Sequence, residues 1–174
     1  MLKLAIDMDE VMADTWSKFI HRFKEQEGFE ISAEMLHGKE LWQAVPESLT
    51  PRVREWINEK NFFRDLPVMP GAREVVAELC NKYEVFVASA ASEFPNSYKD
   101  KYDWLQDHFP FISWKHIVFC GDKSIINADI MIDDRIRNFT QFKGRPILYT
   151  SPHNVNVTHY ERVNNWDEVA GLLL

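Results

Sequence analysis

The sequence predicts an α/β fold in which helices flank a doubly wound, parallel sheet of five strands. Three observations support this prediction. Short apolar runs of strand length alternate with helical stretches over the second part of the chain. Alternation of this kind is typical of parallel sheets with right-handed crossovers. Several of the apolar runs end at a carboxylate, a hydroxyl or an ammonium group, and parallel α/β sheets bind ligands at the ends of their strands.

Size and composition limit the class of protein. The chain has 174 residues, of which 45% are hydrophobic and 27% charged, as is typical of one globular domain or one domain with a large insert. A formal net charge of −7 argues against binding to nucleic acid polymers. No apolar run approaches the roughly 20 residues of a membrane span, and the start of the chain is unlike a secretory leader. With two cysteines and no disulfide framework, we expect a cytoplasmic protein. The sequence leaves the oligomeric state open, with a homodimer as one alternative.

The first part of the chain is expected to hold one strand followed by helices. In chain order these are a strand at 2–6, a helix at 15–27, a short helix from Ser32 to Gly38, an irregular stretch at 41–49, a helix from Thr50 to Lys60 and a linker at 62–71. Apolar side chains recur at helical spacing from Trp16 to Phe23, and Gly28 stops that helix. Ser32 is a typical N-cap, and the proline after Thr50 suits a first helical turn.

The second part alternates strands and helices regularly. In order these are a helix at 72–81, a strand at 83–88, a helix at 98–108, a strand at 116–120, a helical turn at 124–127, a strand at 128–132, an irregular turn to Gly144, a strand at 147–150 and a helix at 166–172. The runs Val85–Ala88 and Ile117–Cys120 are typical of buried strands. The four strands of this part and the strand at 2–6 make up the five strands of the predicted sheet.

A long interval without strands separates these two parts. From Asp14 to about Pro70 the chain has only helical and irregular stretches, and it is far longer than an ordinary connection. We interpret it as a small helical cap inserted after the first strand. The expected domains are therefore a core made of residues 1–14 and 68–174 and a cap made of residues 15–67.

Two carboxylates, Asp7 and Asp9, stand where the first strand ends. Because a buried carboxylate without a partner is costly, this pair needs a counter-charge, and a divalent cation is the simplest one. A second pair, Asp133 and Asp134, ends a later apolar run. The ends of parallel strands share one edge of the sheet, so we expect the two pairs to meet there. A solvated turn would explain the first pair taken alone, and a helix N-terminal cap would explain the second.

Ser89 and Lys123 follow two of the strands that lie between the carboxylate pairs in sequence. Taken singly, a serine at a strand end and a lysine in an exposed loop are the ordinary explanations. In the order Asp7-Met8-Asp9, Ser89, Lys123 and Asp133-Asp134, these residues resemble the four motifs of the haloacid dehalogenase superfamily. This resemblance implies a core with the fold predicted above.

Longer stretches resemble one family of that superfamily, the 5′(3′)-deoxyribonucleotidases. They are Phe62–Ala72, Lys101–Leu105 and the run from Gly121 to Arg135. The resemblance extends from the start of the chain to about Arg135, and the C-terminal forty residues match only loosely. Four positions depart from the better-known members, which have Gly where this chain has Glu10, a Thr-Ser pair where it has Ser89-Ala90, and Arg where it has Gly121.

The resemblance implies roles for individual residues. Asp7 would be the nucleophile that forms an aspartyl-phosphate, and Asp9 the general acid and base. Phosphate would be held by Ser89, the Ala90 N–H and Lys123. Because nucleophile and substrate are both anionic, Mg²⁺ is the expected cofactor; its ligands would be Asp7, Asp133 and the Asp9 backbone carbonyl, with Asp134 supporting them from outside. The resemblance also implies that Trp42, Trp56 and Phe63 face the base or sugar; we expect Lys101 at the surface.

The implied function is a Mg²⁺-dependent phosphohydrolase that acts on (deoxy)ribonucleoside monophosphates, which are small-molecule substrates. A phosphatase for another small organic phosphate is one alternative. A phospho-acceptor regulatory domain is another, although the second aspartate, Asp9, and the long insert argue against it. A nucleotide-binding protein without turnover is a third, which the intact set of acidic residues and Lys123 argues against.

Overall fold

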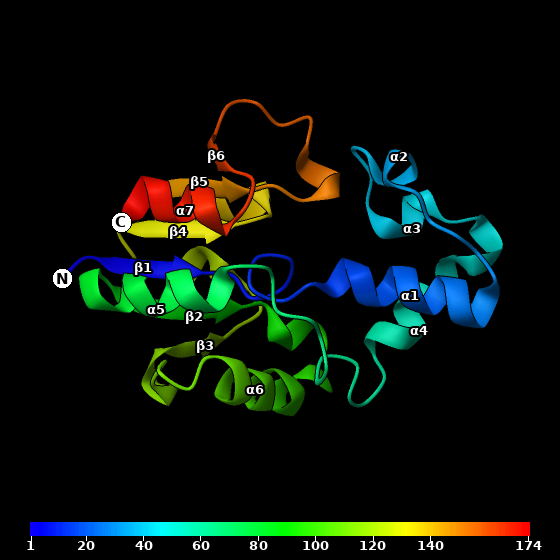
Figure 1. Ribbon diagram of the computed structural model, residues 1–174, viewed down its shortest axis with the longest axis horizontal. Helices are drawn as coiled ribbons and strands as arrows, with labels where there is room; N and C mark the ends of the chain where they lie inside the picture. The colour runs from blue at the N-terminus through cyan, green and yellow to red at the C-terminus, as the bar shows by residue number, and fades with distance from the viewer.

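Six parallel strands form one sheet in the order β3-β2-β1-β4-β5-β6, with β1 next to the middle (Figure 1). The computed structural model describes residues 1–174. The strands are β1 (Lys3–Ile6), β2 (Glu84–Ser89), β3 (Ile117–Phe119), β4 (Ile130–Asp133), β5 (Arg145–Tyr149) and β6 (Glu161–Val163). The α/β fold predicted from the sequence is confirmed.

The prediction of five strands was one too few. Strand β6 pairs with β5 from Ile147–Glu161 to Tyr149–Val163 and forms one edge of the sheet. Its three residues include two charged side chains, so no apolar run marks the strand in the sequence. It forms because β5 offers an open edge, and backbone hydrogen bonds to that edge do not depend on apolar side chains.

Helices fill the remaining chain. They are α1 (Thr15–Glu27), α2 (Ala33–Leu36), α3 (Leu41–Ala44), α4 (Thr50–Ile57), α5 (Ala72–Lys82), α6 (Ser97–His108) and α7 (Trp166–Leu173), with 3₁₀ turns η1 (Glu47–Leu49), η2 (Ala91–Glu93), η3 (Trp114–His116), η4 (Lys123–Ile125), η5 (Ile136–Phe139) and η6 (Pro152–Asn154). The expectation that 41–49 is irregular was wrong, because α3 and η1 lie there; four residues are too few to create a visible periodicity. Helix α4 ends before the expected Lys60, and Asn61 adopts a positive φ of 66° in the turn that follows.

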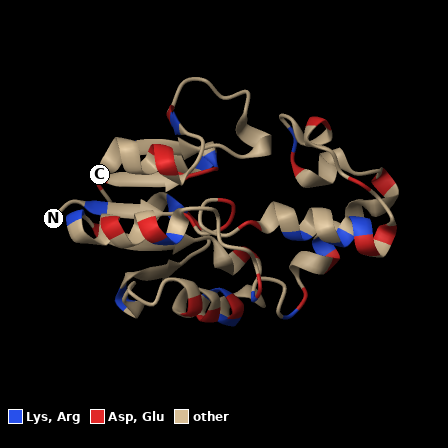
Figure 2. Cartoon of the chain, viewed as in Figure 1, with Lys and Arg blue, Asp and Glu red and all other residues tan.

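The helices α1 to α4 lie beyond the carboxyl ends of the strands, whereas α5 and α7 pack side by side along the sheet (Figure 1). The chain leaves the sheet and returns to it along the same path. The Asp14 N–H donates to the Pro67 carbonyl oxygen and the Met69 N–H to that of Met12, both at 2.8 Å. Charged residues gather in the loops between the strand ends and α1, as Figure 2 shows. No helix is both long and apolar enough to span a bilayer.

One large hydrophobic cluster extends from the sheet into the helices beyond it. It includes Ile6 of β1, Phe23 of α1 and Trp56 of α4. Trp166, at the start of α7, is fully buried in this cluster, and its Nε1–H donates to the Val11 carbonyl oxygen at 2.8 Å. The last helix therefore holds the loop that follows β1.

Replacing that indole tests the contact. We expect Trp166→Phe to lower the free energy of unfolding by about 1–3 kcal/mol, because the buried Val11 carbonyl loses its donor. Urea unfolding followed by circular dichroism measures the change. The matched control is Trp114→Phe, at a side chain that is 66% exposed, which should have little effect. Equal losses in the two variants would contradict the assigned contact.

Candidate active site

The register of the sheet brings the two acidic loops together. Ile6 of β1 is paired with Ile132 of β4, and the Asp7 N–H donates to the Ile132 carbonyl oxygen at 2.9 Å. Asp7 and Asp133 therefore leave adjacent strands at the same level. Carboxylate oxygens of Asp7, Asp133 and Asp134 all lie within 4.8 Å of one another, and all three residues are buried.

Lys123, in η4, lies between the carboxylates of Asp7, after β1, and Asp133, at the end of β4. Its Nζ is 2.5 Å from Asp7 Oδ1 and 2.7 Å from Asp133 Oδ2. Burial alone would lower the pKa of Lys123, but the two carboxylates outweigh it and raise that pKa above its ordinary value. Burial raises the pKa of the Asp7 carboxyl to about 7, and the neighbouring Asp133 adds to the shift while Lys123 opposes it. The ammonium is thus a fixed positive charge beside Asp7.

Asp133 is held by neutral donors as well. The Asn138 Nδ2 amide lies 2.9 Å from both carboxylate oxygens, and the Arg135 N–H donates to Oδ1 at 2.8 Å. Asn138 belongs to η5, the short turn that follows β4. Sequence reasoning missed Asn138, because a lone asparagine in a stretch expected to be irregular carries no signal.

Lys101 was expected at the surface, and that expectation was wrong. Its side chain is 1% exposed, pairs with Asp9 and donates to Ser89 Oγ at 3.0 Å. The ammonium also lies 4.4 Å from the centre of the Phe63 ring. A signal was present in the sequence, because Lys101 shares one face of α6 with Ser97 and Trp104, both buried. A lysine on the buried face of a helix needs an anionic partner, here Asp9.

Ser89 and Ala90 lie at the carboxyl end of β2. Ser89 is fully buried and accepts the Lys101 bond, and Ala90 lines a cavity that opens above the strand ends. Asp7, Asp9 and Lys123 form the floor of the same cavity. The structure thus brings together all the core residues that the sequence had singled out.

Of the three aromatic residues expected to face the base or sugar, two line the cavity and one does not. Trp42, 49% exposed, and Phe63 both line the cavity. Trp56 does not; it is buried in the cluster among the helices, with its ring centre 4.7 Å from that of Phe23 in an edge-on contact. Helical spacing alone cannot tell a side chain that faces a cavity from one that faces the core.

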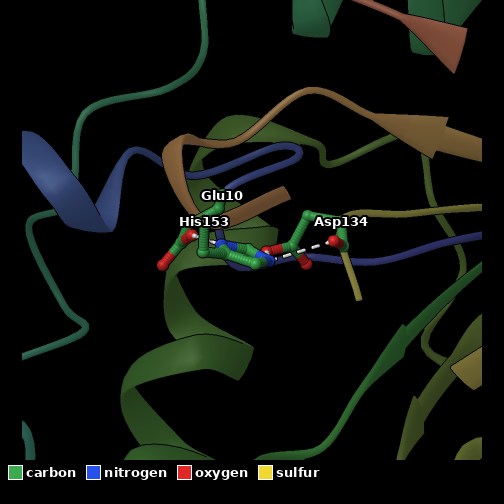
Figure 3. A group of neighbouring side chains, drawn as sticks. All are labelled: Glu10, Asp134 and His153. Atoms are coloured by element: carbon green, nitrogen blue, oxygen red, sulfur yellow. Dashed lines mark hydrogen bonds and ion pairs between the residues drawn. The ribbon is translucent and has the colours of Figure 1, made fainter. Parts of the chain in front are cut away.

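The C-terminal segment contributes residues that sequence reasoning missed. Ser151 Oγ donates to the Glu10 carboxylate at 2.9 Å, and Trp16 Nε1–H donates to the same carboxylate. His153 lies between Glu10 and Asp134 (Figure 3). Burial raises the pKa of Glu10 and, together with the nearby Glu10 charge, that of Asp134. No motif marks Ser151 or His153, which come after the part of the chain that resembles the deoxyribonucleotidases.

The donor set fits a hard divalent cation. Five carboxyl groups meet here, from Asp7, Asp9, Glu10, Asp133 and Asp134. Three cationic side chains pair with them: Lys101, Lys123 and Arg135. Asp9 Oδ1 and Asp134 Oδ2 are buried without a hydrogen-bond partner. Carboxylate oxygens without a hydrogen bond, and more carboxylates than cationic side chains, suit Mg²⁺, which prefers oxygen ligands.

The fold is that of a class of known structures, the haloacid dehalogenase-like proteins. A Bacillus subtilis hydrolase of that class, whose structure holds magnesium, shares the fold with a TM-score of 0.61 at 13% identity, over 99% of this chain and 98% of that one. The family model described as "5' nucleotidase, deoxy (Pyrimidine), cytosolic type C protein" matches residues 1–174. The chain belongs to this family and is an enzyme of the deoxyribonucleotidase-like phosphatase type.

Two curated relatives support this assignment. A 5′(3′)-deoxyribonucleotidase from Bacillus subtilis strain 168 is 38% identical over 183 residues, covering 98% of each chain. A Staphylococcus aureus (strain Mu50) protein, provisionally named a 5′(3′)-deoxyribonucleotidase, is 45% identical over 171 residues, covering 98% of this chain and 94% of its own. Similarity therefore continues through the C-terminal segment, where the resemblance read from the sequence had been loose.

Removing the ammonium group of Lys123 tests the charge balance. We expect Lys123→Met to lower the free energy of unfolding of the metal-free protein by about 3–5 kcal/mol, because two buried carboxylates lose their cation. Urea unfolding in the presence of EDTA measures the change. Lys99→Met is the matched control, since that side chain is 83% exposed and its pair with Asp103 should contribute about 1 kcal/mol or less. Similar losses in both variants would refute the assigned role of Lys123.

Proposed function

We propose that the protein is a Mg²⁺-dependent phosphohydrolase that removes the phosphate group of (deoxy)ribonucleoside monophosphates. The observation that carries this proposal is the convergence of Asp7, Asp133 and Lys123 at one buried point below the cavity. The names of the relatives, both 5′(3′)-deoxyribonucleotidases, support the choice of substrate. Residues 15–67 would act as the cap that selects it.

Asp7 is the proposed nucleophile. Its carboxylate would attack phosphorus to form an aspartyl-phosphate while the bond from phosphorus to the sugar oxygen breaks. A carboxylate 4 Å from a unit negative charge is opposed by about 4 kcal/mol at an effective dielectric of 20, and a phosphate near its dianionic form roughly doubles that. Lys123, 2.5 Å from Asp7, offsets part of this repulsion.

Mg²⁺ would offset the rest, held by Asp7, Asp133 and the Asp9 backbone carbonyl, with Asp134 supporting from outside. The magnesium in the structural neighbour from Bacillus subtilis and the cluster of carboxylate oxygens support this assignment. Bound there, the cation would neutralise charge on the phosphoryl oxygens. Asn138 would keep Asp133 oriented as a ligand, since its amide reaches both carboxylate oxygens.

Asp9 is the proposed general acid and base. It would protonate the leaving sugar alkoxide and then take a proton from the water that attacks phosphorus and releases phosphate from Asp7. Lys101 would orient the Asp9 carboxylate, with which it pairs. The Lys101 ammonium and the Ser89 hydroxyl, 3.0 Å apart, would both face phosphate oxygens, together with the Ala90 N–H.

The cavity supports an organic phosphate with a flat, apolar group. Its lining includes Trp42 and Phe63 along with aliphatic side chains of the cap, among them Leu41 and Val53. Base stacking on an aromatic ring contributes about 1–3 kcal/mol per base in nucleic-acid-binding proteins. We therefore assign Trp42 and Phe63 to the base or sugar, and Trp56, which packs on Phe23, to the support of the cap.

A first experiment tests the chemistry with nucleoside monophosphates. Phosphate release from a panel of deoxyribo- and ribonucleoside monophosphates should depend on Mg²⁺ and be absent in Asp7→Asn. Asp9→Asn should lower kcat by about 100- to 10,000-fold, the range that general acid–base catalysis contributes. Retained turnover in Asp7→Asn would exclude the nucleophile assignment.

A p-nitrophenyl phosphate assay separates the two steps assigned to Asp9. Nitrophenolate leaves without protonation, so Asp9→Asn should give a burst of one equivalent per chain followed by slow turnover, because hydrolysis of the aspartyl-phosphate still needs the base. The unmodified protein should show no burst of this size. A long-lived phosphoprotein without turnover in the unmodified protein would instead favour a phospho-acceptor regulatory domain.

Base recognition is tested by Trp42→Ala. We expect KM for a deoxyribonucleoside monophosphate to rise by about 5- to 150-fold, the equivalent of a lost stacking energy of 1–3 kcal/mol. KM for deoxyribose 5-phosphate, which has no base, should not change. Trp114→Ala serves as a control for loss of an exposed indole elsewhere. If Trp42→Ala affects both substrates equally, the ring does not contact the base, and another small organic phosphate becomes the better candidate.

A further inference from the structure

Glu10 adopts a backbone conformation that is unfavourable for its residue type. Its φ is +64°, and Asn61 is the other non-glycine residue with a positive φ. Asparagine tolerates this region, whereas a long side chain such as glutamate pays roughly 1 kcal/mol or more. Strain next to a site persists where surrounding contacts compensate for it, and for Glu10 those contacts come from its carboxylate.

The Glu10 carboxylate is the first member of a chain of polar contacts that leads across the site. It accepts hydrogen bonds from Trp16 and from Ser151, at 2.9 Å for the latter. Ser151 Oγ lies 3.0 Å from His153 Nδ1, which is itself 3.9 Å from Glu10 Oε2. Segments from the two ends of the chain thus meet at this carboxylate.

His153 continues the chain to Asp134. Its Nε2 lies 3.1 Å from the Asp134 carbonyl oxygen and 3.5 Å from Asp134 Oδ2. A carbonyl oxygen can only accept, so Nε2 carries a proton. Asn154 Nδ2 donates to the same carbonyl oxygen at 2.8 Å. Figure 3 shows the imidazole ring between the two carboxylates, with one nitrogen toward each.

The contacts of His153 argue against a role as a metal ligand. Both of its ring nitrogens already face protein oxygens, on opposite sides of the ring. Asp134, by contrast, has a buried Oδ2 without a hydrogen-bond partner and lies within 4.8 Å of carboxylate oxygens of Asp7 and Asp133. A residue that holds the Asp134 side chain in place therefore also affects the distances among these three carboxylates.

We propose that His153 is a positioning residue of the cation site: through Asp134 on one side and Glu10 on the other, it fixes the spacing between the loop after β1 and the loop after β4. The proposal rests on the proposed function in one respect, that a divalent cation binds between Asp7 and Asp133. Groups that hold metal ligands from outside are typically worth 10- to 100-fold in metal affinity.

Calorimetric titration of the metal-free protein with Mn²⁺, which takes the same oxygen ligands as Mg²⁺, tests the proposal without any assay of activity. We expect His153→Ala to weaken Mn²⁺ binding by about 10- to 100-fold. His153→Gln, whose amide can still donate toward Asp134, should recover most of the affinity. His21→Ala, at an exposed histidine of α1, is the matched control and should bind as the unmodified protein does.

Kinetics provide a second readout. In His153→Ala the Mg²⁺ concentration needed for half-maximal phosphate release should rise, while kcat at saturating Mg²⁺ and KM for the nucleotide should change little. A purely structural role would lower the urea midpoint of His153→Ala without changing metal affinity. If His153→Ala does not fold, Ser151→Ala, which loosens the same chain of contacts, should weaken Mn²⁺ binding in the same direction.

Two results would overturn the proposal. Unchanged Mn²⁺ affinity in a folded His153→Ala or Ser151→Ala protein would show that the bridge does not position the site. Two bound Mn²⁺ ions in the unmodified protein and one in His153→Ala would make His153 a ligand of its own ion. If the unmodified protein bound no Mn²⁺ at all, the cofactor of the proposed function would fail as well, whereas Mn²⁺ binding without phosphatase activity would refute the proposed function alone.

Discussion

The structure depends on the crowding of buried carboxylates at the ends of β1 and β4. Parallel pairing of these strands places the backbone of Asp7 beside that of Asp133. Like charges in a buried place are tolerated only with a counter-charge nearby. Lys123 supplies one, yet carboxylates remain in excess beside it, an arrangement that suits a divalent cation.

The helical segment closes over this charged floor through a few polar contacts. Arg135, next to Asp134, pairs with Glu40 at the start of α3. The Gly38 N–H donates to the Pro152 carbonyl oxygen at 2.9 Å. These contacts, together with the shared hydrophobic cluster, join the helical segment to the rest of the structure.

Particular residues illustrate how far sequence reasoning reaches. Asp7, Asp9, Asp133, Ser89 and Lys123 could be predicted because each follows a strand, and all parallel strands end at one edge. Lys101 was misjudged because its charge was given more weight than its position on the buried face of α6. The sequence could not show that Phe63 lines the cavity whereas Trp56 lies in the core. Both are buried aromatic residues, and only the packing of the helical segment decides which of them faces the cavity. Strand β6 carries no apolar signal at all.

The sequence by itself determined the α/β class, the insertion after the first strand and the acidic, hydroxyl and ammonium groups at the strand ends. These follow from local patterns, because burial periodicity and strand ends are properties of short segments. Only the tertiary structure decided that Glu10, Ser151 and His153 meet at Asp134. Contacts between residues more than a hundred positions apart depend on how the whole sheet is ordered, and no local pattern records that order.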